Sequence, residues 1–322
     1  MICAFLVVDK PPDLTSHDIV AAVRAVTGVK KVGHTGTLDP FATGVLPLAL
    51  GGATRLIQFL DESIKIYDAT IALGAATDTG DPTGRVIREA PVPELEARRV
   101  VDVLATFRGP RMQRPPAFSA VKVAGRPLYE YARKGEAPEV AERKIEITDV
   151  ELLELQPRSL SVRITCSRGT YARVLADEIA AALGTTGHLS ALVRPRSGPF
   201  HLTDAISMHA LGQIVSGDPN RTWQDTLLGR GPGERVPWRP REAVFQDLHP
   251  FLRPAVACLP HLPIVDVTPA DARRIRAGGL PPLAPAGVAV GSKYLVLAGS
   301  DVVAVAERDA RGPRIGKVIE PT

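Results

Sequence analysis

The alternation of apolar and polar residues along the chain predicts interspersed strands and helices. Period-two alternation with β-branched residues indicates a strand, and a 3.6-residue period indicates a helix. Their hairpin-like spacing favours a mixed α/β class with a largely antiparallel sheet over a strict βαβ repeat. The expected strands are Phe5–Asp9, Ile66–Leu73, Val86–Arg88, Glu146–Leu155 and Leu160–Cys166, and the expected helices are Ser16–Val26, Glu94–Thr106, Tyr171–Leu183 and Asp204–Val215.

The pattern changes after residue 211. Between Gly212 and Arg253, 10 of 42 residues are Gly or Pro and no strong period survives, which is typical of a linker or irregular insertion. Beyond it, short strands with one helix between them predict a small β-rich accessory domain. The expected organisation is a domain over 1–211, a linker or insertion over 212–255, and an accessory domain over 256–322, with strands at Leu262–Val267, Tyr294–Leu297 and Val302–Glu307.

Composition excludes several classes of protein. The 322 residues are 45% hydrophobic, enough to bury a core, and the formal charge is +4, which permits a nucleic-acid partner without demanding one. No run approaches the roughly 18 apolar residues of a spanning helix, and the apolar start lacks a basic flank, so it indicates a strand and not a signal peptide. Cys3, Cys166 and Cys258 lie too far apart to suggest a disulfide framework, which fits a cytoplasmic protein.

Positive charge is concentrated between Arg108 and Lys144. This segment has nine basic and four acidic residues, and its net +5 exceeds that of the whole chain. Pro110, Pro115 and Pro116 favour an extended loop, with a short helix from Leu128 to Arg133. A solvated surface loop and a nucleic-acid-binding loop both remain open on composition alone.

The densest cluster of special residues runs from Gly33 to Arg55 and surrounds one carboxylate, Asp39. Gly36 and Gly44 permit close backbone approach, and Pro40 restricts Asp39 to extended conformations. A functional carboxylate and a simple Asx-turn both fit, and spacing alone favours the turn. His34 has no second His or Cys at ligand spacing, so a metal site is disfavoured.

A second cluster runs from Cys166 to Leu183. Gly169-Thr170 ends a strand and opens a helix, whose first turn would present Tyr171 and Arg173 to an anionic group. The alternative is a core tyrosine with a surface cation. The acidic sequence GAATDTGDPTG, residues 74–84, lacks EF-hand spacing and predicts a turn with Asx hydrogen bonds. P-loop, GxGxxG, GxSxG and HExxH motifs are absent, so nucleotide-cofactor and common hydrolase functions lack support.

Together these clusters resemble the tRNA pseudouridine synthase B (TruB) family over about residues 5 to 210. One short motif can arise by chance, whereas five blocks in the family's order identify the chain as similar to it. The blocks are Asp9-Lys10-Pro11 with Thr15-Ser16; His34-Thr35-Gly36-Thr37-Leu38-Asp39-Pro40 with Ala42-Thr43-Gly44; Lys65-Ile66-Tyr67; Ser119-Ala120-Val121-Lys122 with Gly125 and Tyr129; and Gly169-Thr170-Tyr171 with Arg173.

The resemblance implies the pseudouridine synthase fold of the α+β class, with a mixed, largely antiparallel sheet and flanking helices. LPIVDVTPADARRIRAGG is similar to the PUA-like domain of the family, which implies contact with the acceptor arm of tRNA. The implied activity converts uridine to pseudouridine at position 55 in the T-loop of tRNA. Because this isomerisation exchanges an N1–C1′ bond for a C5–C1′ bond without redox change, no cofactor and no metal are expected.

The resemblance also assigns roles. Asp39 is implied as the nucleophile, and Arg173 pairs with it and keeps it ionised. Tyr67 is expected to stack on the target base, and Tyr171 is the second active-site tyrosine. The sequence leaves open whether Asp39 attacks the ribose, attacks the base or first removes a ribose proton.

Further residues are implied in RNA binding. Leu192 matches an apolar pocket position, and His34 matches the residue that stacks where the flipped uridine was. Lys10 belongs to a block that supports the active-site loop. The basic segment 108–144 corresponds to a mobile RNA-clamping insertion, whose charges would bind phosphates. Its candidate contacts are Arg111, Arg114, Lys122 and Arg126.

The chain departs from the family pattern at a few positions that leave Asp39, Tyr67 and Arg173 intact. Arg168 and Ala172 replace the usual Lys and Ile, and Arg55 stands where Lys is common. Two alternatives to a stand-alone enzyme, which we expect to act as a monomer without a membrane, stay open. One is a non-catalytic RNA-binding or tRNA-folding protein on the same scaffold, and the other is an RNA-guided pseudouridine synthase.

Overall fold

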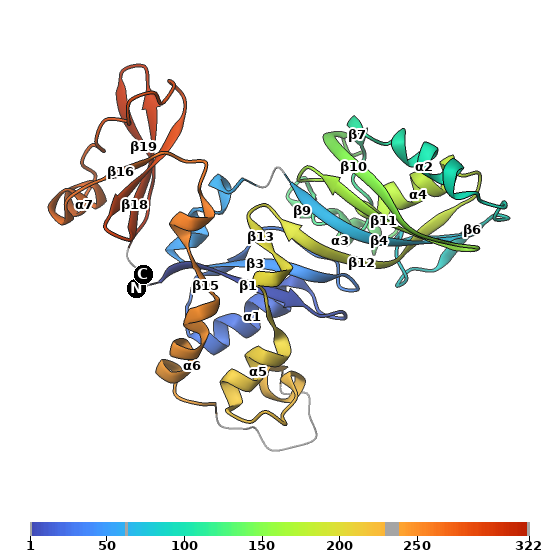
Figure 1. Ribbon diagram of the computed structural model, residues 1–322, viewed down its shortest axis with the longest axis horizontal. Coiled ribbons are helices and arrows are strands. Elements are labelled where there is room, and N and C mark those ends of the chain that lie inside the picture. The colour runs from blue at the N-terminus through green and yellow to red at the C-terminus, as the bar shows by residue number, and fades with distance from the viewer. Residues whose placement is uncertain (1, 62–63, 229–237, 321–322) are drawn as a thin grey trace. The chain divides into compact units, whose positions relative to one another are not determined.

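The computed structural model describes residues 2–61, 64–228 and 238–320 (Figure 1). The chain divides into two compact units. The segment Asp39–Gly44 belongs to unit 2, although its sequence neighbours on both sides belong to unit 1. The domain boundaries at residues 211 and 255 stay sequence predictions. Unit 1 comprises Met1–Leu38, Val45–Asp61 and Pro199–Thr322, and unit 2 comprises Asp39–Gly44 and Glu62–Gly198.

Unit 2 is built on an antiparallel sheet with the strand order β12-β4-β11-β10-β7. The first residues of β3 extend it, because Thr43 and Gly44 pair in parallel with Val193 and Arg194 of β12. The expected mixed, largely antiparallel sheet is therefore confirmed. These strands are β3 (Thr43–Gly51), β4 (Lys65–Leu73), β7 (Gly109–Gln113), β10 (Arg143–Gln156), β11 (Ser159–Cys166) and β12 (Gly187–Ser197).

Strand β4 has one buried face and one partly exposed face. Its side chains alternate between the two along all 9 residues, which is the pattern that predicted the strand. Tyr67 points to the buried face. On the other face Asp68 accepts hydrogen bonds of 2.7 and 2.8 Å from Arg163 of β11. The pleat therefore places Tyr67 and Asp68, adjacent in sequence, in opposite environments.

One helix of unit 2 contains most of the second sequence cluster and packs against the sheet. The helix α4 (Ala172–Ala182) packs against β12 and β4 through a buried stripe that includes Leu175 and Ile179. It begins at Ala172, one residue after the predicted start at Tyr171. The remaining elements are α2 (Ala97–Ala105), which packs on β10, α3 (Leu128–Ala132), and two small hairpins, β5 (Ala75–Thr77) with β6 (Val86–Glu89) and β8 (Lys122–Val123) with β9 (Arg126–Pro127).

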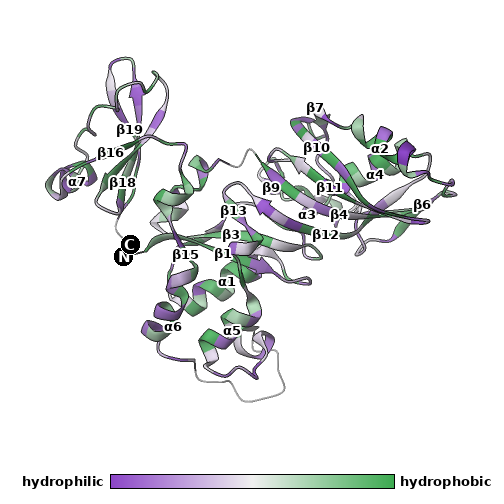
Figure 2. Ribbon diagram, viewed as in Figure 1, coloured by the Kyte–Doolittle hydropathy of each residue, from purple (hydrophilic) through white to green (hydrophobic). Residues whose placement is uncertain are grey.

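In unit 1, β1 (Cys3–Lys10) is a buried strand that lies between β14 and β3 and also pairs with β15. Figure 2 shows β1 and β3 as mostly hydrophobic. A strand that is buried on both faces shows no alternation of apolar and polar residues. The sequence pattern therefore did not predict β3, whereas it predicted β1 from its β-branched run. The partner strands are β2 (Val32–His34), β13 (Phe200–His201), β14 (Ile206–Ser207) and β15 (Leu252–Pro254).

The helix α1 (Ser16–Thr27) shows how local sequence sets an element's ends. Thr15 accepts a hydrogen bond from the Asp18 backbone N–H, and the Asp18 side chain accepts from the Thr15 N–H, which completes a capping box. The helix ends at Gly28, whose φ of 68° is the left-handed conformation that glycine adopts without strain. The predicted start of this helix at Ser16 is confirmed.

The end of the chain forms the predicted small β-rich module within unit 1. Its sheet has the order β16-β17-β18-β19, and Tyr294 and Val303 are fully buried in its core with Ile275 of α7. The elements are β16 (Ile264–Asp266), α7 (Pro269–Arg276), β17 (Lys293–Ala298), β18 (Asp301–Asp309) and β19 (Gly312–Val318).

The stretch between residues 212 and 255 contains a helix that the sequence pattern did not predict. The helix α5 (Met208–Ser216) begins four residues later than expected and runs into this stretch, and α6 (Arg241–Leu248) lies within it. The helix α6 buries only Val244 and Leu248, so its apolar stripe is too short to show a period. Residues 229–237 of the predicted linker lie outside the described residues.

Candidate active site

The site is centred on an ion pair between Asp39 and Arg173. Arg173 approaches the carboxylate side-on: its Nε lies 2.9 Å from Asp39 Oδ2, and its Nη2 donates to Oδ1 at 3.2 Å. The Arg173 side chain is 6% exposed, whereas that of Asp39 is 31% exposed. A bidentate pair fixes both the position and the orientation of the carboxylate. Asp39 is therefore a held carboxylate with one side open.

Arg173 also joins two other loops to this carboxylate. Its Nη1 donates to the carbonyl of Thr79 at 2.9 Å, and its Nη2 donates to the carbonyl of Phe118 at 2.8 Å. A second carboxylate oxygen, Asp81 Oδ2, lies 3.8 Å from Nη1. One guanidinium thus connects the loop of Asp39, the turn after β5 and the start of the basic segment, so a change in any of them reaches the carboxylate.

Asp81 organises the acidic turn. Its Oδ1 accepts hydrogen bonds from the Thr79 hydroxyl at 2.7 Å and from the Thr83 hydroxyl and N–H at 2.6 and 3.0 Å. The turn with Asx hydrogen bonds predicted here is confirmed. Gly80, at φ +72°, would place a Cβ 3.3 Å from Arg173 Cβ, so glycine permits the close approach. The sequence pattern did not reveal that this turn supports the arginine of the site.

Tyr67 and Leu192 lie on neighbouring strands of the same sheet. Leu192 of β12 pairs with Ala69 of β4, two residues from Tyr67 on the buried face, and both Leu192 and Tyr67 are buried. Burial raises the pKa of the Tyr67 phenol above its usual value, and the Arg194 guanidinium opposes that rise. The structure thus brings an aromatic ring and an apolar side chain to one face, as a base-binding pocket requires.

Tyr171 is held through its backbone. Gln113 at the end of β7 accepts from the Tyr171 N–H at 2.8 Å and donates to the Tyr171 carbonyl at 3.2 Å. Gln113 is 3% exposed, so both hydrogen bonds are shielded from water. This clamp fixes the residue before α4, whose first turn carries Arg173. Nothing in the periodicity of the sequence pointed to Gln113.

Lys10 and His34 belong to unit 1. Lys10 is fully buried, and its ammonium donates to the carbonyls of Pro11 and Leu14 at 2.8 and 2.7 Å. It stabilises the turn before α1, and because it is buried it offers RNA no surface. His34 is the last residue of β2, which pairs with β3 through His34 and Leu48.

The basic residues of the 108–144 segment differ in their exposure and in the contacts that their side chains make. Arg111 lies 4.5 Å from the centre of the Phe107 ring and 3.5 Å from Glu178. Arg126 lies 4.5 Å from the Tyr131 ring. Arg114 is more exposed, with a Glu142 oxygen at 3.9 Å, and Lys122 is exposed on β8. Arg114 and Lys122 are therefore better placed for phosphate contacts than Arg111.

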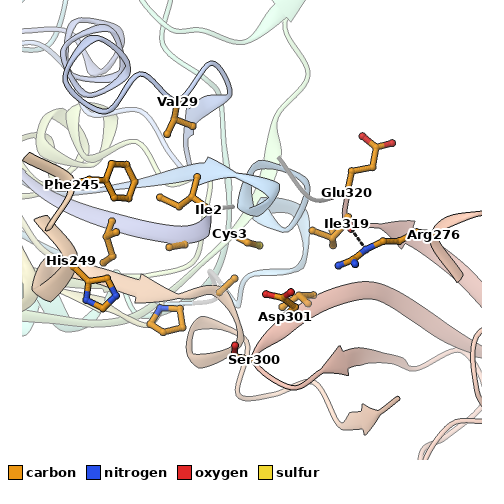
Figure 3. A pocket seen from close by; sticks show the side chains of 15 residues that line it. Ile2, Cys3, Val29, Phe245, His249, Arg276, Ser300, Asp301, Ile319 and Glu320 are labelled. Atoms are coloured by element: carbon orange, nitrogen blue, oxygen red, sulfur yellow. Dashed lines mark hydrogen bonds between the residues drawn. The ribbon is translucent and has the colours of Figure 1, made fainter. Parts of the chain in front are cut away.

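Unit 1 contains a separate pocket of about 540 Å³ (Figure 3). Ile2 and Phe245 line its apolar part, and Arg276 at its other end donates to the Ile319 carbonyl at 3.4 Å. Burial, aided by the nearby Asp301 carboxylate, raises the pKa of the Cys3 thiol to about 11, so Cys3 is a protonated thiol at neutral pH. No residue predicted for the active site lines this pocket.

The described residues contain neither a cluster of metal-ligating side chains nor a helix able to span a membrane. Across 2–61, 64–228 and 238–320, no three His, Cys, Asp or Glu side chains gather in a way that could hold a metal ion. Within the same residues, every helix is too short or too polar to span a membrane.

Solved structures define the class of the fold. Over 99% of its length the chain matches 85% of a chain in a crystal structure of a Cbf5-Nop10-Gar1 complex, with a TM-score of 0.66 and 26% identity. A structure of an H/ACA RNP bound to a substrate RNA containing 2′-deoxyuridine matches with a TM-score of 0.67 at 24% identity, which supports the fold alone. These matches show that, over nearly its whole length, the chain has the fold of chains in those two complexes.

Sequence comparisons give the family. Residues 24–172 match the model of the TruB family pseudouridylate synthase N-terminal domain. A tRNA pseudouridine synthase B of Geobacter sulfurreducens is 41% identical over 94% of this chain and 92% of its own length. One of Francisella tularensis subsp. novicida is 47% identical over 65% of this chain and 70% of its own length. The chain belongs to the TruB family of pseudouridylate synthases.

Proposed function

We propose that this protein isomerises uridine to pseudouridine in tRNA, and that its target is uridine 55 of the T-loop. The observation that carries the proposal is the side-on pair of Asp39 with the buried Arg173. The family membership and the tRNA pseudouridine synthases that the chain resembles over nearly its whole length support the same activity.

The reaction makes defined demands on the site. The N1–C1′ bond breaks, the uracil turns, and C5 bonds to C1′; C5 then loses its proton and N1 gains one, so atoms and electrons balance without a cofactor. Arg173 favours the ionised carboxylate of Asp39 and aims it, and Asp39 serves as the nucleophile of a covalent step. The open side of the carboxylate is where the nucleotide would reach it.

The target uridine must leave its stack to reach Asp39. Flipping a base costs a few kcal/mol, which contacts to the flipped base have to offset. Tyr67 supplies a stacking surface and Leu192 an apolar wall, and both lie on the same face of the sheet. Tyr171 borders the start of α4 beside Arg173, and His34 is the residue we propose to stack in the vacated position.

RNA binding outside the pocket is proposed for two regions. Arg114 and Lys122, with Arg126 and Arg111 in supporting positions, would contact phosphates of the T-arm. The four-stranded module at the end of the chain, which we propose to be PUA-like, would contact the acceptor arm.

The experiment that tests the chemistry follows the C5 proton. A tRNA transcript containing [5-³H]uridine is incubated with protein in excess, and released tritium is counted. Asp39→Asn should abolish release and leave the Kd for tRNA within about threefold. Asp68→Asn is the matched control, because Asp68 lies on the other face of β4, and it should release tritium at the wild-type rate. Binding without release by the wild-type protein would instead favour a non-catalytic RNA-binding protein.

A further inference from the structure

A β-bulge lies directly opposite Tyr67. Strand β12 pairs with β4 through Val193 and Asp68, but the pairing shifts by one residue before it resumes at Arg196 and Ile66. Two residues, Arg194 and Pro195, therefore face the single residue Tyr67. Proline has no N–H for the ladder, so it is tolerated where the pairing is interrupted. Bulges re-aim side chains and are frequent beside active sites.

The bulge places a fully buried arginine between two parts of the site. Arg194 is 0% exposed. On one side is the strand of Tyr67, and on the other Arg194 pairs with Gly44, the last residue of the segment that begins at Asp39. A Cβ on Gly44 would lie 2.5 Å from the Arg194 carbonyl oxygen and 2.9 Å from its nitrogen, and Gly44 has φ +101°. Only glycine allows this close approach.

The charge of Arg194 acts on Tyr67. A guanidinium stays protonated even when buried, and burial without hydrogen-bond acceptors would be strongly unfavourable. The Tyr67 phenol is one acceptor, since the hydrogen bond and the charge of Arg194 both lower the pKa that burial raises. The Asp39 carboxylate acts on the same phenol in the opposite direction. The Arg194 guanidinium and the Asp39 carboxylate thus act on the pKa of the Tyr67 phenol in opposite directions.

We propose that Arg194 is a positioning residue for the reaction: from the bulge opposite Tyr67, it donates a hydrogen bond to the phenol oxygen and fixes the ring and its hydroxyl against the flipped uracil. The inference rests on the proposed function and deepens it, because it explains why the side chain proposed to stack on the base is a tyrosine on the buried face of β4. Arg194 touches no reacting atom and acts through Tyr67.

A double-mutant cycle tests this role. Arg194→Met, Tyr67→Phe and the double variant are compared in single-turnover reactions with tRNA, with Arg196→Lys as control. Arg196 lies on the same strand beyond the bulge, and its Nε donates to the Gly198 carbonyl at 3.0 Å. We expect Arg194→Met to lower the rate about 100-fold, as misplacement of a reacting partner does, with the Kd for tRNA unchanged. In the Tyr67→Phe background, the same change should lower the rate less than twofold further.

The cycle separates positioning from general stability. Independent losses in the two backgrounds, or a loss confined to the Kd for tRNA, would overturn the proposal. If Arg194→Met does not fold, as circular dichroism shows directly, the cycle is run with Arg194→Lys, and independent losses there overturn it equally.

A second readout does not depend on activity. In protein labelled with 3-fluorotyrosine, ¹⁹F NMR follows each of the five tyrosines, and Tyr67→Phe assigns the resonance of Tyr67. Loss of the Arg194 hydrogen bond should raise the pKa of Tyr67 above that in wild type, and Arg196→Lys should leave it unchanged. An unchanged pKa in the Arg194 variant would overturn the hydrogen bond even if the protein proved inactive on tRNA, so this failure is distinct from failure of the proposed function.

Discussion

At the scale of single residues, the site depends on one arginine that serves three loops. Arg173 donates to Asp39, to the Thr79 carbonyl and to the Phe118 carbonyl, and it is nearly inaccessible to water. Its position in the first turn of α4 was predictable from the sequence, as was its pairing with Asp39 from the family resemblance. Its two backbone partners were not, because a carbonyl carries no residue-type signal.

Replacing Arg173 with lysine should inactivate the enzyme although the charge is kept. An ammonium cannot form the side-on pair and the two carbonyl hydrogen bonds at once. We expect the single-turnover rate of Arg173→Lys to fall at least about 100-fold. Arg163→Lys is the matched control, because Arg163 forms a similar bidentate pair with Asp68 on the exposed face, and its rate should stay within twofold. Equal effects of the two variants would contradict the assignment.

Buried thiols make stability fall at alkaline pH. Burial raises the pKa of Cys166 from 9.0 to about 11 and that of Cys258 to about 12, so the folded state retains protons that the unfolded state loses. This stabilisation is fully present below pH 9 and is lost as pH rises toward the folded values, by about 1.4 kcal/mol per pH unit for each thiol. Urea unfolding from pH 8 to 10.5 measures it. Cys166→Ala should show a shallower decline, and an unchanged slope would refute the argument.

At the scale of elements, alternation predicted β4, β10 and β11, whereas β3 and β12 were missed. Strand β3 is buried from Gly44 onward and carries Pro47, and β12 is interrupted by the bulge at Arg194 and Pro195. The burial of β3 and the bulge of β12 remove the alternation that would have predicted these strands. The same two features build the site, because they bring the Asp39 segment and Arg194 to Tyr67. Tertiary pairing decides such strands, and local sequence does not reveal it.

The close contact between β3 and β12 predicts that Gly44→Ala strongly destabilises the fold. Gly135→Ala is the control, because a Cβ there has no such contact. Gly135→Ala introduces a side chain at φ +73° where a Cβ meets no described atom within 4 Å, and should lower the free energy of unfolding by about 1 kcal/mol. Gly44→Ala adds a steric clash with the Arg194 backbone, so about 3 kcal/mol is expected. Urea unfolding of both variants checks the difference. Equal losses would show that the close approach is not maintained in solution.

The basic segment should reveal its RNA contacts through salt dependence. Each phosphate contact that is lost reduces the slope of log K against log salt by about 0.7 to 0.9. Combined substitution Arg114→Gln and Lys122→Gln should therefore lower the slope by about 1.4 to 1.8. Arg111→Gln should change it less, since Arg111 contacts Phe107 and Glu178. An unchanged slope in the double variant would make the segment an ordinary solvated loop.

At the scale of the whole molecule, the net charge of +4 does not show that positive charge is concentrated in the 108–144 segment. The basic segment contacts Arg173 through the Phe118 carbonyl and Tyr171 through Gln113, so the segment proposed to bind RNA and the residues proposed for catalysis share contacts in unit 2. The resemblance in five ordered blocks predicted the family, which the relatives confirm. The helix α6 and the division of the chain into its two units could not be predicted from the sequence, because they depend on contacts between distant segments.

The most direct test of the account is to map pseudouridine in an unmodified tRNA transcript after incubation with the purified protein and no other RNA. We predict one pseudouridine, at position 55 of the T-loop, and none with Asp39→Asn. Absence of T-loop pseudouridine with the wild-type protein, or its formation only when a guide RNA is added, would contradict the proposal of a stand-alone tRNA pseudouridine synthase.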